Sequence, residues 1–132
     1  MKAVKGQELF LSTENKVGQL SAVSKLMKEA NINVRAISAY VVADKAFFRL
    51  VTSDNAGARC VLKSMGTVDS KEVIIVEMAD EVGYLYNLAA KLRDANINLI
   101  HIYGTTVRTG VDANIIFSSS DNNKALEVVS RL

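Results

Sequence analysis

Two glycines and two asparagine-containing blocks repeat along the chain, and their residue types suit the binding of a small polar molecule. Gly18 returns as Gly83, 65 positions later, and each glycine follows a valine and stands two positions before a leucine. The tetrapeptide Ala-Asn-Ile-Asn of residues 30–33 returns unchanged, at the same spacing, as residues 95–98. Two blocks that match at one spacing identify an internal repeat.

Each glycine is expected at the first turn of a helix that follows a strand. A glycine lets the chain turn tightly. It also leaves backbone N–H groups open at the positive end of the helix, where a carboxylate or a phosphate docks. Because the glycine is duplicated together with an asparagine beyond the helix, we weigh a binding site equally with a simple turn.

The asparagines of the repeated block have two expected roles. Asn31 and Asn96 are expected to end the helix, since asparagine tolerates the left-handed conformation there. Asn33 and Asn98 enter the next strand, and their side chains both donate and accept hydrogen bonds. Such a side chain suits a zwitterionic amino acid, which carries an ammonium group beside a carboxylate.

The two glycine turns differ in charge. Asn15 and Lys16 make the first turn neutral to cationic, which favours an anionic group. Asp80 and Glu81 make the second turn acidic, so it is expected to repel a carboxylate and to accept an ammonium group. The repeat therefore predicts two unequal sites.

Few residues of the sequence are of types that act in catalysis or bind metals. One histidine and one cysteine do not form the cluster of ligands that a metal site needs. The sequence contains no serine-hydrolase elbow, phosphate loop or dinucleotide fingerprint. We therefore expect no metal, no cofactor and no catalytic residue. His101 and Tyr103, with Tyr40 in the corresponding strand of the first repeat, leave a small enzyme as the least favoured alternative.

The apolar pattern predicts the same order of elements in both repeats, residues 1–69 and 70–132. Each repeat opens with a short strand, continues with a helix carrying one apolar stripe, then forms a hairpin and a second helix. The predicted strands are 9–11, 34–42 and 46–52 in the first repeat and 73–76, 99–107 and 115–117 in the second. Asp54 and Asp121 are expected to cap the second helix of each repeat.

Each repeat is thus β-α-β-β-α, one strand short of a ferredoxin-like β-α-β-β-α-β unit. The predicted fold is α+β, with antiparallel sheets that carry helices on one face. We expect the repeats to share strands, so that the strand 71–78 lies beside the first sheet and also begins the second. Because each half is small, we also expect the halves to share one core.

The composition is that of an ordinary globular protein. The net charge of +2 gives no indication of nucleic acid or of an acidic membrane surface as a partner. No apolar segment is long enough to span a bilayer, and the start of the chain has no secretion signal. We therefore expect a cytoplasmic protein. The single cysteine, Cys60, lies in a predicted amphipathic helix, so we expect a buried thiol.

These motifs resemble the signature of the ACT domain, once in residues 15–33 and again in residues 80–98. The resemblance covers nearly the whole chain and is greatest to the small stand-alone tandem ACT proteins. It implies a regulatory module that binds an amino acid or a similar small carboxylate where two ACT units meet. It also implies a homo-oligomer, expected as a dimer, and a regulated metabolic enzyme on a separate chain.

The resemblance places ligand binding at the turn before each glycine and at the asparagine after each helix. The candidate ligand-binding residues are Asn15, Lys16, Val17, Gly18, Leu20, Asn33, Asp80, Gly83, Leu85 and Asn98. Val17 and Val82 replace the proline usual before the glycine. A second hypothesis is a ligand-free scaffold that binds a partner through an apolar outer sheet face carrying Phe10, Phe47 and Val51.

Overall fold

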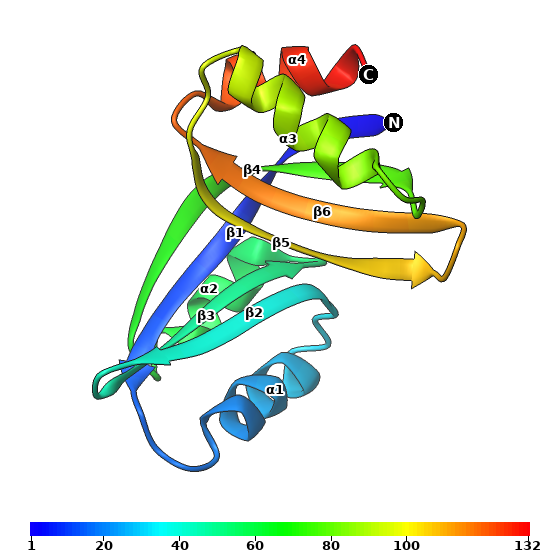
Figure 1. The fold of residues 1–132 in the computed structure, drawn as a ribbon. Helices are drawn as coiled ribbons and strands as arrows, with labels where there is room; N and C mark the ends of the chain where they lie inside the picture. Colours follow the sequence, from blue (N-terminus) through cyan, green and yellow to red (C-terminus); the bar gives the residue numbers. More distant parts are fainter. The chain divides into compact units, whose positions relative to one another are not determined.

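The computed structural model describes all residues from 1 to 132, and its elements follow the order expected from the repeat (Figure 1). The first repeat contributes β1 (Lys2–Glu14), α1 (Gln19–Glu29), β2 (Val34–Val42), β3 (Lys45–Thr52) and α2 (Asn55–Leu62). The second contributes β4 (Thr67–Ala79), α3 (Tyr84–Asp94), β5 (Leu99–Arg108), β6 (Asp112–Ser119) and α4 (Asn122–Ser130). None of these helices has the length and apolarity that crossing a bilayer would need.

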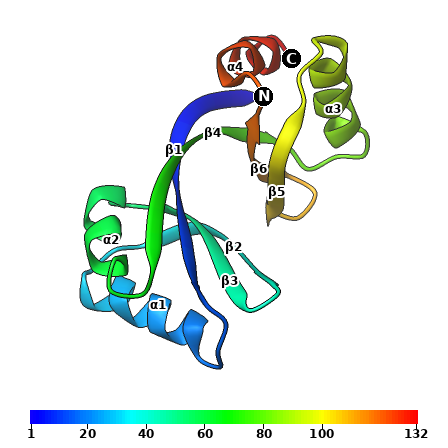
Figure 2. The same ribbon diagram turned by 90° about the vertical axis from the view of Figure 1, so that its left-hand side faces the viewer.

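The chain forms two compact units. The N-terminal unit comprises residues 7–71, and the C-terminal unit comprises residues 1–6 together with 72–132. In the N-terminal unit the strands lie in the order β2-β3-β1-β4, and α1 and α2 cover one face (Figure 2). β3 pairs antiparallel with both β1 and β2, and Phe48 of β3 lies opposite Leu11 and Ala39.

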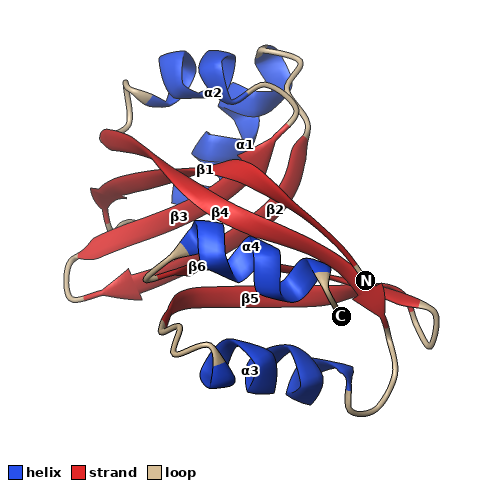
Figure 3. Cartoon of the chain, turned by 90° about the horizontal axis from the view of Figure 1, so that it is seen from above, coloured by secondary structure: helices blue, strands red, loops and turns tan.

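The C-terminal unit repeats this arrangement with the order β1-β4-β6-β5. β6 pairs antiparallel with β4 and β5, so that Phe117 lies opposite Ile74 and Ile102. Figure 3 shows α3 and α4 as the helices of this unit. The ferredoxin-like fold in two antiparallel copies is therefore confirmed.

β1 and β4 are each 13 residues long because each strand serves both units. In the N-terminal unit Ser70 Oγ donates to Gln7 Oε1 at 3.1 Å, and Gly66 has no room for a Cβ beside the carbonyl of Ser12. In the C-terminal unit Lys5 Nζ lies 3.9 Å from a carboxylate oxygen of Glu72. Each unit thus obtains its fourth strand from the other repeat, and the expected strand sharing is confirmed.

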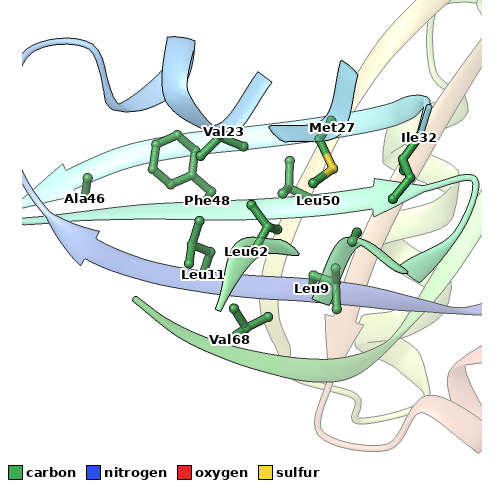
Figure 4. Close-up of a cluster of buried hydrophobic side chains, with 11 residues drawn as sticks. Leu9, Leu11, Val23, Met27, Ile32, Ala46, Phe48, Leu50, Leu62 and Val68 are labelled. Carbon is green, nitrogen blue, oxygen red and sulfur yellow. The ribbon is translucent and has the colours of Figure 1, made fainter. Parts of the chain in front are cut away.

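The expectation of one shared core is wrong, because the buried apolar side chains form two clusters. Leu9, Leu50 and Leu62 belong to the cluster of the N-terminal unit, which lies between its sheet and its helices (Figure 4). Phe117, Leu88 and Val129 belong to the cluster of the C-terminal unit. The fourth strand lets each unit close its own core, so strands are shared and cores are not.

The second helix of each repeat begins as predicted. Asp54 accepts a hydrogen bond from Gly57 N, and Asp121 accepts one from Lys124 N, each at 3.0 Å. The expectation of a buried Cys60 thiol is wrong, because Cys60 is exposed. The buried residues of α2 are Ala58 and Leu62, which are one helical turn apart, and Cys60 projects from the opposite side.

Candidate functional site

Both glycines adopt the left-handed conformation at the N-cap position of a helix. Gly18 has φ +91° before α1, and Gly83 has φ +95° before α3. A Cβ at either position would meet nothing within 4 Å, so open space surrounds both turns. The glycine is therefore required by the backbone conformation, and it leaves the helix N-terminus uncovered.

The N-terminus of α1 has no side-chain cap. The first helical hydrogen bond runs from Ala22 N to the carbonyl of Gly18 at 2.9 Å, which leaves the N–H groups before Ala22 without a helical partner. Those groups lie at the positive end of the helix dipole. These N–H groups can donate hydrogen bonds to the oxygens of a bound carboxylate.

Gln19 is a residue of the candidate site that sequence reasoning missed. Its side chain is buried, and its Nε2 donates to the carbonyl of Glu14 at 2.8 Å and to Thr13 Oγ1 at 3.3 Å. These bonds fasten the start of α1 to the end of β1. The corresponding residue of the second repeat is Tyr84, which has no amide, and this difference between otherwise matching blocks was the available signal.

A hollow of about 260 Å³ lies beside the first glycine turn. Four candidate residues line it, namely Asn15, Lys16, Gly18 and Leu20. The remaining lining residues are Gln19 from α1, Ala39, Tyr40 and Val41 from β2, and Ala46, Phe47 and Phe48 from β3. Val17, the other candidate of this turn, is fully exposed and is absent from the lining. The hollow therefore combines uncapped N–H groups and a cation with apolar strand residues.

A hydrogen-bonded network stands behind the hollow. Tyr40 accepts a hydrogen bond from Arg49 Nε at 3.4 Å, and Arg49 Nη1 donates to the buried Glu8 carboxylate at 3.0 Å. Burial lowers the pKa of Arg49, but the hydrogen bonds to Tyr40 and Glu8 outweigh burial and raise it above its usual value. Arg49 also lies 4.6 Å from the ring centre of Phe10, which stacks on Phe47. The sheet face predicted to be apolar thus also carries a cation and a carboxylate.

The asparagines that end the helices act as predicted. Asn31 and Asn96 have φ +56° and +58°, and they donate to the carbonyls of Lys28 and Arg93. The next residue, Ile32 or Ile97, is buried and bonds back to the carbonyl five positions earlier. This is the Schellman arrangement, which needs no ligand.

Asn33 and Asn98 lie at the end of the helix opposite the glycine turn. The backbone carbonyl of each asparagine accepts from the backbone N–H of Ser53 or Ser120, and the asparagine N–H donates to the Oγ of the same serine. Their side chains are exposed. Because α1 has 11 residues, about 16 Å separates its two ends. Within one unit the structure does not bring Asn33 to the first glycine turn.

The second glycine turn has different neighbours. Asp80 Oδ2 accepts a hydrogen bond from Gly110 N in the β5–β6 hairpin at 2.7 Å. In that hairpin Arg108 donates to Asp112, and this bond lowers the pKa of the Asp112 carboxyl. Leu85 is exposed, as Leu20 is in the first repeat. A hollow of about 300 Å³ in this unit is lined by Met1, Tyr84, Asn87 and Leu132, without the acidic turn.

The remaining chemical candidates form no centre of their own. The rings of His101 and Tyr103 lie 5.5 Å apart and are tilted by 53°. Neither residue lines the two hollows described above. No group of three or more His, Cys, Asp or Glu side chains is placed to hold a metal ion.

The fold and the glycine turns define a tandem of two small α+β domains. Residues 4–131 match the family model described as an ACT domain pair, and the chain therefore belongs to this family. ACT domains are regulatory modules rather than catalytic ones. The resemblance found in the sequence is confirmed.

Solved structures with the same fold cover nearly the whole chain. Protein BT0572 from Bacteroides thetaiotaomicron has a TM-score of 0.89 and 25% identity, over 98% of this chain and 89% of that one. The ligand-free regulatory subunit of aspartate kinase from Thermus thermophilus has a TM-score of 0.67 and 12% identity, over 98% and 95%. The aspartokinase alpha and beta subunits have a TM-score of 0.66 and 13% identity, over 99% and 96%. Among curated proteins, none matches the chain.

Proposed function

We propose that the protein is a non-catalytic cytoplasmic sensor that binds a free amino acid or a similar small carboxylate. The observation that carries this proposal is the hollow at the first glycine turn. It brings together four residues that the sequence alone singled out, beside a helix N-terminus that no side chain caps. The volume, about 260 Å³, is slightly below the usual range of ligand pockets, so it suits a small ligand.

In this proposal, the residues around the hollow have the following roles. The N–H groups at the start of α1 and the exposed ammonium group of Lys16 attract the carboxylate. The amide of Asn15 both donates and accepts, so it can bind the ligand's ammonium group through its oxygen. Leu20, Ala39 and Phe48 offer apolar contact to the remainder of the molecule.

Assembly through a second ACT unit is the other half of the proposal. Four pairs of exposed apolar residues recur at the repeat spacing with nearly equal exposed fractions: Val17 and Val82, Leu20 and Leu85, Ile37 and Ile102, Val42 and Val107. In each unit they belong to the glycine turn, the first helix and the outermost strand. Uncovered edge strands with apolar side chains favour association.

This assembly explains the placement of Asn33. In its own unit Asn33 lies at the end of α1 that is far from the hollow. In the proposed assembly, the Asn33 that precedes the edge strand of a neighbouring unit reaches the hollow instead. We therefore propose a homodimer in which the ligand lies between the glycine turn of one unit and the Asn33 strand of another. A separately encoded metabolic enzyme is the proposed target of the response.

Calorimetric titration of the whole protein with each of the twenty amino acids tests this proposal. We expect at least one to bind, and we expect Lys16→Ala to weaken its binding by roughly tenfold through the lost charge. Lys63→Ala is the matched control, since Lys63 is also an exposed lysine beside a helix but follows the end of α2 and does not line the hollow. No binding of any amino acid at millimolar concentration would refute the sensor.

A ligand-free scaffold remains the second candidate, and the fully exposed Val17 and Val82 favour it. In that case the apolar edges bind a partner or a second copy without any small molecule. Sedimentation equilibrium distinguishes the ligand-free scaffold from the amino-acid sensor. A dimer that forms without added amino acid, together with a negative titration, supports the scaffold, and a monomer at all concentrations refutes its self-associating form.

A further inference from the structure

The two glycine turns have nearly identical backbones, but the second one is fastened to a neighbouring hairpin by a side chain. Asp80 Oδ2 accepts from Gly110 N at 2.7 Å, while Asp80 N donates to the carbonyl of Val111 at 3.1 Å. In the first repeat the backbone bond is present, from Asn15 N to Asp44 O at 2.9 Å, but the Asn15 side chain makes no bond to its hairpin. The side-chain contact belongs to the second turn alone.

The hairpin that receives this contact is itself held in shape. It is two residues longer than its counterpart, and Gly110 has φ +75° at its tip. Arg108 bonds Asp112 with Nη2 at 2.9 Å and Nε at 3.2 Å, and Val111 N donates to the carbonyl of Arg108 at 2.8 Å. The Asp80 side chain is therefore hydrogen-bonded to a hairpin loop that other contacts already hold in one conformation.

The charged residues of the two glycine turns also favour carboxylate binding at the first turn over the second. Asp80 and Glu81 replace Asn15 and Lys16, so these positions carry two negative charges in the second turn, whereas in the first turn they carry one positive charge, which is paired with Glu14 at 3.3 Å. Two carboxylates just before the start of α3 oppose the docking of a further anion at this helix end. The carbonyl of Glu81 also accepts from Tyr84 N at 3.3 Å, which removes one of the donors that an anion would use.

From these contacts we propose that Asp80 is a latch between the second glycine turn and the β5–β6 hairpin, and that the negative charge at this turn repels a carboxylate, so that each chain binds one carboxylate ligand and not two. The proposal rests on the proposed function for the first turn. The two copies of the motif then have different roles: the first copy binds the ligand, and the second copy fastens α3 to the β5–β6 hairpin.

Equilibrium dialysis of the whole protein against each of the twenty radiolabelled amino acids measures the number of ligand molecules bound per chain. For every amino acid that binds, we expect saturation at one molecule per chain. The double variant Asn15→Asp with Lys16→Glu, which gives the first turn the charges of the second, is expected to abolish that molecule. Saturation at two per chain, or full binding by the double variant, would overturn the proposal.

Hydrogen exchange at the Gly110 amide tests the latch without any ligand. Asp80→Ala is expected to accelerate this exchange by roughly tenfold, whereas Asp80→Asn retains an acceptor oxygen and should have a smaller effect. Asn15→Ala is the control and should leave the exchange of Ala43, the residue matching Gly110, unchanged. If no amino acid binds, the proposed function and the count of one both fail. A Gly110 exchange rate that Asp80→Ala does not alter would refute the latch by itself.

Discussion

Gly18 and Gly83 have the same backbone conformation and the same open surroundings, yet their neighbours give them different chemistry. The first turn has Gln19 fastening it to β1 and a lysine beside the hollow. The second has Asp80 fastening it to a hairpin. Both repeats keep the backbone conformation that requires glycine, while the residues around it differ between the two turns.

Alanine at the two glycines separates these contributions. Because both positions have a positive φ and neither Cβ would clash, Gly18→Ala and Gly83→Ala should each lower the free energy of unfolding by about 1 kcal/mol. Only Gly18→Ala should also weaken amino-acid binding. Urea unfolding followed by calorimetric titration measures both effects, and equal loss of binding in the two variants would contradict unequal turns.

At the scale of elements, the second helices of the two repeats begin with matching caps. Asp54 and Asp121 have φ of −152° and −153°, and each accepts from the backbone N–H three positions later. Asp54→Ala and Asp121→Ala should each cost about 1 kcal/mol of unfolding free energy. Denaturation of each variant in urea measures this cost. The exposed Asp69→Ala serves as the control, and a clearly smaller loss for one cap would show that the repeats are not equivalent there.

The β5–β6 hairpin should respond to acid. The Arg108 hydrogen bond lowers the pKa of Asp112 in the folded chain, so this contact stabilises the hairpin above the ordinary carboxyl range and is lost as pH falls through the lowered pKa. We expect Arg108→Gln to return the pKa of Asp112 toward the reference value of 3.8. Carboxyl NMR titration measures this shift, and an unchanged Asp112 titration would contradict it.

The sequence predicted the elements whose cause is local and the sharing of strands between the repeats, but it missed the full length of the shared strands and the contacts between distant residues. Periodicity and turn residues located β2 and β3 nearly to the residue. The strands predicted at 9–11 and 73–76 extend to Lys2–Glu14 and Thr67–Ala79 because β1 and β4 lie against each other in both units, which no local pattern records. The Asp80–Gly110 contact spans 30 positions, and it was missed for the same reason.

At the scale of the whole molecule, the shared strands make the two units unequal as fragments. Residues 7–71 contain all four strands of the N-terminal unit in one continuous segment, whereas the C-terminal unit also needs residues 1–6. We expect a fragment 1–71 to fold and a fragment 72–132 to remain largely unfolded. Circular dichroism and amide exchange of the two fragments check this, and a folded 72–132 would show that the borrowed strand segment is dispensable.

The strand exchange also sets an order of events during synthesis. Residues 7–71 can close their core as soon as they leave the ribosome, while residues 1–6, made first, have no partner until the segment that begins at Glu72 appears. At about 5–20 residues per second, translation of the second repeat takes several seconds. For that interval residues 1–6 form an unpaired strand edge, which makes them the segment on which a chaperone or a second nascent copy would act.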